Sequence, residues 1–242
     1  MKKQLGLLLS AVFIAGTAFG QFVRLDETSF TASASTITFS EFGLNTVNPS
    51  YTLASVDLGS VDIDFEGYFD GQSNSGGEII GSPTGPLALD SGAPDTFITT
   101  DGANPTSPVL SGSPRFNGPI AILFSKDVNA VGLDGGFFDN VASMSITAYK
   151  RDGSALGSVT NTTTGIEFFG LADSSGANSI AGVTFSITGN EPAGYAIDNL
   201  TFGSTQVLVN PAIPEPSTYA FLGMGTMGLL MYLRRRRNSR KA

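Results

Sequence analysis

The chain has 242 residues, of which 13 are basic and 21 acidic, and its formal net charge is −8. It contains no histidine and no cysteine. These two absences exclude a Ser-His-Asp triad, a Cys-His pair, a histidine-ligated zinc site, a thiolate redox centre and disulfide bonds. The catalysis that is left open would use carboxylates, as glycoside hydrolysis does.

The first twenty residues have the three parts of a secretory signal peptide. Lys2 and Lys3 form a positive start, residues 5–18 are apolar, and Ala18-Phe19-Gly20 is a small-x-small cleavage site. We expect signal peptidase to cut after Gly20, with a cut after Ala18 as the alternative. The sequence therefore predicts an exported protein without residues 1–20.

Residues 21–210 are predicted to form one domain, which is long enough for a sizeable core. Eight of the 13 basic residues lie in the first three and last nine positions, so the part between the ends keeps 5 basic and 20 acidic residues, a balance of about −15. So acidic a surface argues against nucleic acid binding through phosphate contacts. It fits either the plain solvated surface of an extracellular protein or a protein that binds divalent cations.

Alternation of apolar and polar residues predicts the first strands of this domain. In residues 35–42, Ile37, Phe39 and Glu41 lie on one side of the expected strand, with threonine and serine on the other. Two further strands are expected at 51–58 and 61–69, separated by Gly59-Ser60.

The next segment, residues 71–118, is expected to be irregular because proline occurs throughout it. At most, short strands are predicted at 87–89, 96–99 and 109–110. A segment of this length is either a functional loop region or flexible surface.

Residues 119–203 show the clearest strand pattern. Strands are expected at 119–124, 128–133, 142–149, 155–160, 166–171, 180–188 and 195–202. Asp152-Gly153 predicts a tight turn between two of them, because this pair tolerates the positive φ that hairpin turns need. Strands at this spacing, without helical periodicity, predict an all-β fold, an antiparallel β-sandwich.

The last part of the chain, residues 211–242, combines three features. Pro214-Glu215-Pro216 stays extended, residues 217–233 form an apolar run just long enough for a transmembrane helix, and Arg234-Arg235-Arg236-Arg237 cannot enter hydrocarbon. An ordinary C-terminal membrane anchor is one interpretation.

This order of motifs closely resembles the PEP-CTERM sorting signal of Gram-negative bacteria. The resemblance implies recognition by an exosortase, passage through the inner membrane, and a final place at the cell surface or in the extracellular matrix, in association with extracellular polysaccharide. It concerns the tail alone and implies nothing about what the domain does there.

Residues 119–203 also resemble the sandwich domain of many PEP-CTERM proteins, through Thr147–Tyr149, Asp152–Val159, Phe168–Gly170 and Ile197–Leu200. The resemblance implies a jelly-roll topology similar to carbohydrate-binding modules. In such modules a structural calcium often joins an acidic residue on an early strand to an aspartate on the last one. Glu41 and Asp198 occupy those places, so the resemblance implies calcium there, completed by carbonyl oxygens and waters.

Three further carboxylates, Asp62, Asp64 and Glu66, are predicted to share one face of the strand at 61–69. They are interpreted first as the solvated face of an edge strand, and otherwise as a cation site or a catalytic pair. Aromatic platforms for sugars would have to come from Tyr or Phe, since tryptophan is absent; the candidates are Tyr68, Phe69, Phe137, Phe138 and Tyr195, most of them expected in the core.

Two classes of function stay open from the sequence. We expect a non-catalytic surface or matrix protein, with polysaccharide as a candidate ligand. The alternatives are a glycan-active enzyme that uses carboxylates and a plainly membrane-anchored surface protein.

Overall fold

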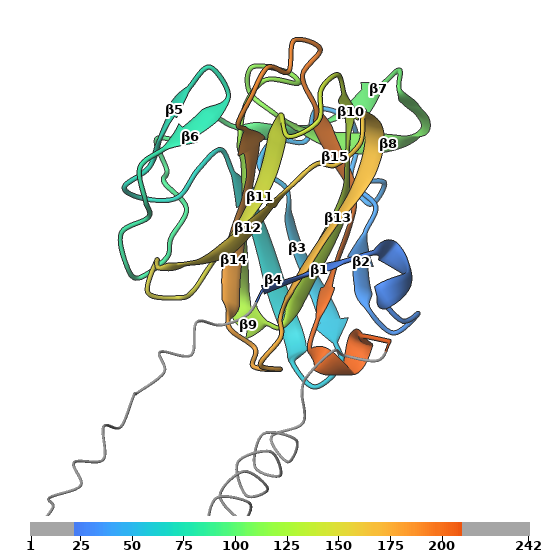
Figure 1. Ribbon diagram of the computed structural model, residues 1–242, viewed down its shortest axis with the longest axis vertical. Helices are drawn as coiled ribbons and strands as arrows, with labels where there is room; N and C mark the ends of the chain where they lie inside the picture. The colour runs from blue at the N-terminus through green and yellow to red at the C-terminus, as the bar shows by residue number, and fades with distance from the viewer. Residues whose placement is uncertain (1–21, 210–242) are drawn as a thin grey trace, which may run out of the picture.

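The computed structural model describes residues 22–209, and these form an antiparallel β-sandwich (Figure 1). The predicted signal peptide with its cleavage sites, and the predicted membrane helix with its arginine block, lie outside the described residues. Within residues 22–209 no helix has the length and apolar character needed to cross a membrane. The strands are β1 (Phe22–Leu25), β2 (Ser35–Ile37), β3 (Ser50–Ser55), β4 (Gly59–Glu66), β5 (Ser73–Ser75), β6 (Glu78–Ile80), β7 (Thr96–Asp101), β8 (Asn104–Gly112), β9 (Ile120–Val128), β10 (Ala130–Phe138), β11 (Met144–Tyr149), β12 (Ala155–Thr160), β13 (Gly165–Asp173), β14 (Ile180–Ile187) and β15 (Ala196–Gly203), with short 3-10 helices η1 (Glu27–Ser29) and η2 (Thr205–Val207).

Two large sheets make up the sandwich. The seven-stranded sheet has the order β1-β13-β10-β15-β8-β7, with β2 paired to β15, and the six-stranded sheet has the order β12-β11-β14-β9-β4-β3. From β8 onward the chain passes from one sheet to the other at almost every connection; the hairpin β11–β12 is the exception. The all-β antiparallel prediction is therefore confirmed.

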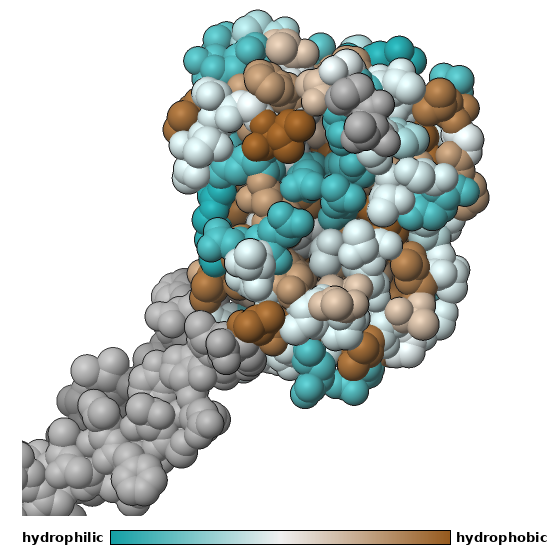
Figure 2. Space-filling view, turned by 90° about the vertical axis from the view of Figure 1, so that its right-hand side faces the viewer, coloured by the Kyte–Doolittle hydropathy of each residue, from teal (hydrophilic) through white to brown (hydrophobic). Residues whose placement is uncertain are grey.

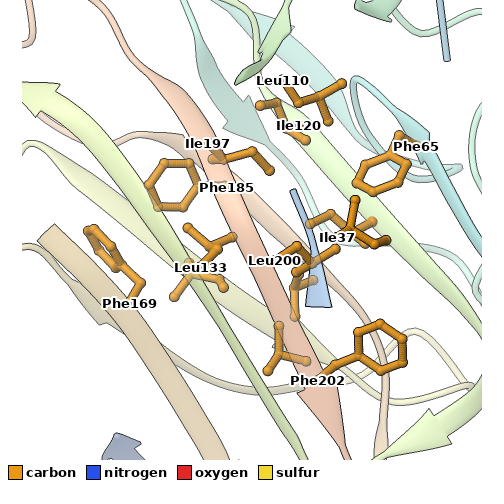
Figure 3. Packing of buried hydrophobic residues seen from close by; sticks show 14 of the residues in the cluster. Ile37, Phe65, Leu110, Ile120, Leu133, Phe169, Phe185, Ile197, Leu200 and Phe202 are labelled. Atoms are coloured by element: carbon orange, nitrogen blue, oxygen red, sulfur yellow. The ribbon is translucent and has the colours of Figure 1, made fainter. Parts of the chain in front are cut away.

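The core lies between the two sheets and is filled by aliphatic and phenylalanine side chains. Figure 3 shows Leu133, Phe169, Ile197, Leu200 and Phe202 of the seven-stranded sheet facing Phe65, Ile120 and Phe185 of the six-stranded one. All of these are essentially inaccessible to solvent. Burial of apolar surface at about 25 cal/mol per Å² is what holds the two sheets together.

Local sequence accounts for several strands directly. In β4, Val61, Ile63 and Phe65 are buried while the intervening acidic residues face outward, which confirms the predicted alternation. The predicted turn at Asp152-Gly153 is also present: Gly153 has φ +83°, and the Asp152 carboxylate accepts hydrogen bonds from the backbone N–H (2.9 Å) and hydroxyl (2.6 Å) of Ser154. This turn joins β11 to β12.

The strand expected at 35–42 ends early, at Ile37. The Glu41 carboxylate accepts hydrogen bonds from the Thr38 N–H (2.9 Å) and hydroxyl (3.0 Å), which turns the chain back on itself. Phe39 has φ +56° and is fully buried, whereas Glu41 is exposed. The prediction that Glu41 shares a strand face with Ile37 and Phe39 is wrong.

The region expected to be irregular, residues 71–118, contains four strands. β7 and β8 form a long hairpin at the edge of the seven-stranded sheet, so the strands expected at 96–99 and 109–110 are present but longer than predicted. Pro108 lies opposite Thr100 of β7, and on the other side of β8 the strand β15 pairs at a single position, Leu110 opposite Ile197.

Residues 67–95, the cover segment, lie over the outer face of the six-stranded sheet and carry β5 and β6 (left in Figure 1). Phe69 and Leu87 pack on Ala121 of β9, Ala181 of β14 and Tyr149 of β11. Gly182 permits this close approach, since a Cβ atom there would lie 2.8 Å from the Phe69 ring. The Gln72 amide donates to the Tyr149 hydroxyl at 3.2 Å, so the cover is fixed by polar contacts as well.

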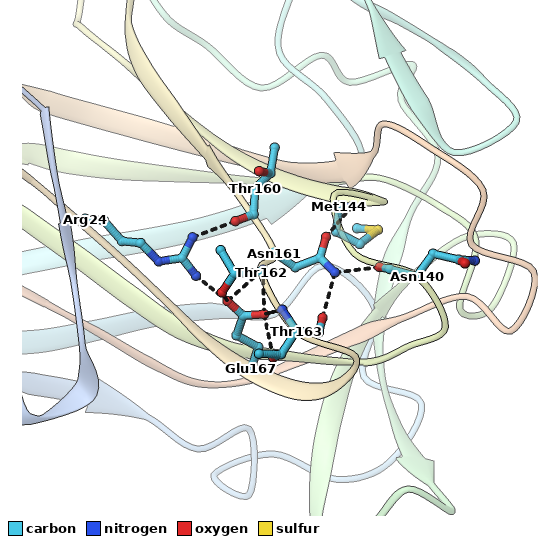
Figure 4. A network of polar contacts seen from close by, with 8 residues as sticks. All are labelled: Arg24, Asn140, Met144, Thr160, Asn161, Thr162, Thr163 and Glu167. Carbon is cyan, nitrogen blue, oxygen red and sulfur yellow. Dashed lines mark hydrogen bonds and ion pairs between the residues drawn. The ribbon is translucent and has the colours of Figure 1, made fainter.

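The two ends of the described chain are tied into the fold. Arg24 of β1 forms an ion pair with Glu167 of β13 and donates to the Thr160 carbonyl of β12 at 2.6 Å, which closes one edge of the sandwich (Figure 4). At the other end of the chain, Val209 N–H donates to the Ser29 carbonyl (2.7 Å), and Thr31 N–H donates to the Val207 carbonyl (2.8 Å). We call this pairing of 29–31 with 207–209 the terminal clip.

Candidate functional site

Two adjoining cavities lie at one end of the seven-stranded sheet, on its outer face. They share Asp101 and Gly136, and we call them together the groove. The larger cavity has a volume of about 310 Å³ and the smaller of about 20 Å³. The groove is lined by Asp101, Ala103, Asn104, Val109, Phe116, Asp134, Gly135, Gly136, Phe137, Ile166, Ala193, Gly194, Tyr195, Ala196, Ile197 and Asp198.

Two aspartates on neighbouring strands form the polar part of the groove. Asp134 of β10 and Asp198 of β15 are direct partners in the register, and they point outward because Leu133 and Ile197 beside them point into the core. The Asn199 amide donates to Asp134 at 2.8 Å, and the Asn104 amide donates to Asp198 at 2.8 Å. Each carboxylate is thus held in position by a neutral amide.

Asp198 is the most enclosed of these groups, with 3% of its surface exposed. Burial raises the pKa of Asp198 above its ordinary value, and the negative charge of Asp134 raises it further. Hydrogen bonds from Asn199, Ser107 and Asn104 act in the opposite direction and offset only part of this shift. The free energy of ionising Asp198 is therefore less favourable in the folded protein than in water.

An exposed aromatic ring stands at the rim of the groove. Phe137 has 51% of its surface exposed, whereas the next residue, Phe138, is fully buried in the core. Ile166, half exposed, lies beside it on β13. Figure 2 shows the side of the molecule that carries β2, β8 and β13, where hydrophilic residues gather in the upper half next to isolated hydrophobic ones. Apolar contacts beside a few placed polar groups are the usual make-up of a binding site.

One buried glutamate holds the loop that forms a wall of the groove. Glu191 accepts hydrogen bonds from the Ser143 hydroxyl (2.5 Å) and the Asp139 N–H (2.8 Å). The Asp139 carboxylate in turn accepts from the Ala193 N–H (2.9 Å). Beyond this point Tyr195 donates its N–H to Phe116 O (2.6 Å) and its hydroxyl to Gly118 O (2.6 Å). Three separate loops are thereby locked together around the larger cavity.

The predicted calcium residues, Glu41 and Asp198, are linked only indirectly. Glu41 bonds to Thr38, and the Thr38 carbonyl accepts a 3.4 Å hydrogen bond from Ser107, which also bonds to Asp198. Across residues 22–209 no three or more Asp or Glu side chains are arranged to hold a metal ion. Calcium at this pair stays a prediction.

The predicted carboxylate row lies on the other sheet, away from the groove. Asp62 accepts from Thr52 (2.7 Å), Asp64 from Ser50 (2.6 Å) and Glu66 from Asn48 (3.0 Å). Burial raises the pKa of Glu66, with a further contribution from the charge of Asp95. Their partners are hydroxyls and an amide on the same face, the arrangement expected of a solvated strand face. β4 lies between β9 and β3, so the expectation that it is an edge strand is wrong.

The aromatic residues predicted as candidate sugar platforms differ in their exposure to solvent. Phe69, Phe138 and Tyr195 are buried, Tyr68 is half buried, and Phe137 is exposed at the groove. Sequence reasoning singled out Asp198 and Phe137 but missed Asp101, Asn104 and Asp134. The one local signal was Asp134 itself, a carboxylate at an outward position of a glycine-rich strand, Leu133-Asp134-Gly135-Gly136.

Comparison with known proteins identifies the tail. The fold is that of an all-β domain with a ligand-sized groove, and residues 212–237 match the PEP-CTERM protein-sorting motif. The matched span includes both Pro214-Glu215-Pro216 and Arg234–Arg237, the motifs from which the family was predicted. The chain is therefore a PEP-CTERM sorting-domain protein, and as such an exported protein sorted to the cell envelope or surface. No curated protein matches the chain.

Three solved structures are similar at low identity. The family 11 carbohydrate-binding module of the cellulosomal cellulase Lic26A-Cel5E of Clostridium thermocellum is 11% identical with a TM-score of 0.28, over 72% of this chain and 96% of that one. A second structure of the Clostridium thermocellum family 11 module, in complex with a β-1,3-1,4-mixed-linked tetrasaccharide, is 8% identical with a TM-score of 0.25, over 76% and 95%. The enzymatically active domain of tailspike protein 4 of bacteriophage CBA120 is 14% identical with a TM-score of 0.23, over 73% of this chain but 19% of that one. Likenesses at these TM-scores carry no argument about function.

Proposed function

We propose that this protein is an exported, non-catalytic component of the cell surface or extracellular matrix that binds polysaccharide in the groove. The observation that carries the proposal is the groove itself, where carboxylates and amides stand beside the half-exposed ring of Phe137. Sugar hydroxyls can donate to carboxylates, and hydrogen bonds to charged groups contribute about 1.5–3 kcal/mol each. The apolar face of a sugar ring can lie on Phe137.

The positions of the carboxylates favour binding over hydrolysis. Glycoside hydrolysis uses two carboxyl groups that flank the bond to be cut, one of them free to exchange a proton. Asp134 and Asp198 instead rise side by side from paired strands, and each is held by an asparagine amide. A carboxylate-dependent glycan-active enzyme is the alternative, and release of shorter products from a bound glycan would favour it.

Binding through the groove is tested with the full-length chain in detergent micelles, titrated with oligosaccharides of the host's own matrix polysaccharide. Phe137→Ala is expected to weaken binding strongly, by about 2 kcal/mol if this ring is a hot spot. Phe42→Ala is the matched control, since Phe42 is also an exposed phenylalanine (42%) but lies elsewhere. Equal losses in the two variants, or no loss in either, would remove the groove from the proposal.

The proposal includes the route to the surface. Signal peptidase removes residues 1–20 after Gly20 or Ala18, the apolar run 217–233 enters the inner membrane as a helix, and an exosortase recognises Pro214-Glu215-Pro216. Intact-mass measurement on protein recovered from the envelope or medium is expected to show both ends removed. A tail recovered whole in the outer fraction would favour the plain membrane anchor instead.

A further inference from the structure

The groove differs from the rest of the surface in the charge of its lining. Three of its residues are carboxylates, Asp101, Asp134 and Asp198, and none is lysine or arginine. A ligand in this groove therefore meets negative charge without any compensating positive side chain.

All five basic side chains of residues 22–209 are placed elsewhere. Arg24 pairs with Glu167, Arg151 pairs with Asp127, Lys126 donates to the Leu58 carbonyl, Arg115 lies over the Phe97 ring at 5.4 Å, and Lys150 contributes to the electrostatic environment of Asp152 and Asp173. None of these five side chains is among the residues that line the groove.

The surroundings of Asp198 also indicate that the groove binds a positively charged ligand. It is almost completely buried, yet its hydrogen-bond partners are neutral and it has no ion pair within residues 22–209. Buried charges in proteins are normally paired or bound to a metal. The Asn104 amide and the Asn199 N–H each donate to one Asp198 oxygen at 2.8 Å, and Ser107 adds a further neutral hydrogen bond. An ionised carboxylate has about four acceptor sites, so it can accept another donor.

We propose that the ligand is a glycan with protonated amino groups, that is, a polymer containing deacetylated hexosamine. This inference rests on the proposed function and names its ligand class. An ammonium group can balance the negative charge of Asp134 and Asp198, and it can donate up to three hydrogen bonds. The face of Phe137 adds a cation–π contact, worth about 0.5–1 kcal/mol at an exposed site.

Other glycan classes fit less well. An N-acetylated or otherwise neutral sugar offers no counter-charge to the buried carboxylate. A uronic acid polymer brings more negative charge to a groove that has no basic residue, and like charges at short range repel. The groove therefore discriminates by charge as well as by shape.

The test compares three probes on the full-length chain in detergent at low salt: a glucosamine hexasaccharide, its fully N-acetylated counterpart and a hexauronate. The glucosamine probe is expected to bind at least about tenfold more tightly than the acetylated one, a difference of about 1.4 kcal/mol. The preference is expected to fall as sodium chloride is added and to vanish once the pH is high enough to deprotonate the amines. The hexauronate is expected not to bind.

Asp134→Asn is expected to abolish the preference for glucosamine while it keeps the hydrogen bond from Asn199. Asp62→Asn removes the same charge from the outer face of the other sheet and is expected to leave the preference unchanged. If the acetylated and glucosamine probes bind equally and Phe137→Ala weakens both, the charge inference fails and the proposed function stands. If no probe binds, the charge inference fails, and the proposed function is decided separately by the titration with the host's own oligosaccharides.

Calcium is the rival counter-charge. If millimolar calcium raises the melting temperature of the unliganded protein more than sodium chloride at matched ionic strength does, and if Glu41→Gln and Asp198→Asn remove that rise, the charge of Asp198 is balanced by a metal and the inference is overturned. An equal response to the two salts supports it.

Discussion

The two outer faces of the sandwich use their acidic residues in different ways. On the six-stranded sheet, Asp62 and Asp64 are matched by hydroxyls on the neighbouring strand, and much of the remaining face is buried under the cover segment. On the seven-stranded sheet, Asp134 and Asp198 lie in a groove beside an exposed ring. The protein's own chain covers part of the first face, whereas the second face has the groove in which we propose that a ligand binds. A row of carboxylates in the sequence is therefore a poor guide to a site, because such a row can be satisfied by hydroxyl groups on the neighbouring strand.

The largest effect on stability is expected when the packing between the cover segment and the six-stranded sheet is removed. Phe69→Ala deletes a fully buried ring between the cover segment and the six-stranded sheet, and such truncations cost about 3–5 kcal/mol. We expect a loss of that order in the free energy of unfolding, measured by denaturant titration of the full chain. Glycan affinity of the folded fraction is expected to stay unchanged, because the groove is on the other sheet.

Tyr68→Ala serves as the control, since Tyr68 is adjacent but only half buried. If Phe69→Ala abolished glycan binding in protein that is still folded, the two faces would not be independent.

A smaller effect is expected from the carboxylate that shapes the groove wall. Glu191→Ala leaves the Ser143 hydroxyl and the Asp139 N–H without their acceptor in the interior, at a cost of about 1–3 kcal/mol. Unlike Phe69→Ala, it is expected to weaken glycan binding too, because the loop before β15 loses its attachment.

Denaturation and glycan titration of the same preparation separate the two effects. Glu78→Ala, on exposed β6, is the matched control and is expected to change neither quantity. Undiminished affinity in Glu191→Ala would mean that the wall does not depend on this residue.

The smallest expected effect is on the pH dependence of the free energy of unfolding, to which Asp198 and Glu167 contribute with opposite signs. Burial on its own would raise the pKa of Glu167, but hydrogen bonds from the backbone and side chains of Thr163 and Thr162 hold it below its ordinary value (Figure 4). Glu167 therefore stabilises the fold above its unfolded pKa, 4.5, and this contribution is lost as the pH falls through the lower folded value. Asp198, with a raised pKa, behaves in the opposite way: its contribution is most favourable below 3.8 and is lost as the pH rises through the folded value.

Denaturation midpoints measured between about pH 3 and 7 test whether the contributions of Glu167 and Asp198 to stability change with pH in opposite directions. The deficit of Glu167→Gln relative to the natural chain is expected to shrink as the pH falls. Asp198→Asn is expected to gain stability relative to the natural chain as the pH rises. Parallel pH profiles for the two variants would contradict the contrast between the carboxylates.

Local pattern was sufficient for the strands whose partners are close in sequence or whose two faces differ sharply. β4 alternates acidic and apolar residues, and the pair Asp152-Gly153 predicts the turn of the β11–β12 hairpin. β8 pairs mainly with the adjacent β7, but its prolines hide this hairpin from local pattern, because proline within a run argues against a strand. β1 is four residues long and pairs with β13, which is far away in sequence, so no local window contains its partner.

The groove was only partly predictable for the same reason. Asp101, Asp134 and Asp198 come from three strands, and only the sheet order brings them together. Asp198 was found through a resemblance and paired with Glu41, yet the turn at Thr38 leaves Glu41 outside the lining of the groove. Whether a phenylalanine is a platform or a core residue depends on its side of the strand, as Phe137 and Phe138 show.

The terminal clip determines the end of the sandwich at which the chain leaves the domain toward the tail. It lies beside η2, at the lower end of the sandwich in Figure 1, whereas the loop before β15 that walls the groove is at the upper end. From Val209 to Ser217, where the apolar run begins, the chain can span at most about 28 Å. In the proposed route, where residues 217–233 enter the inner membrane, so short a connection keeps the clip end of the domain near the membrane and places the groove at the opposite end.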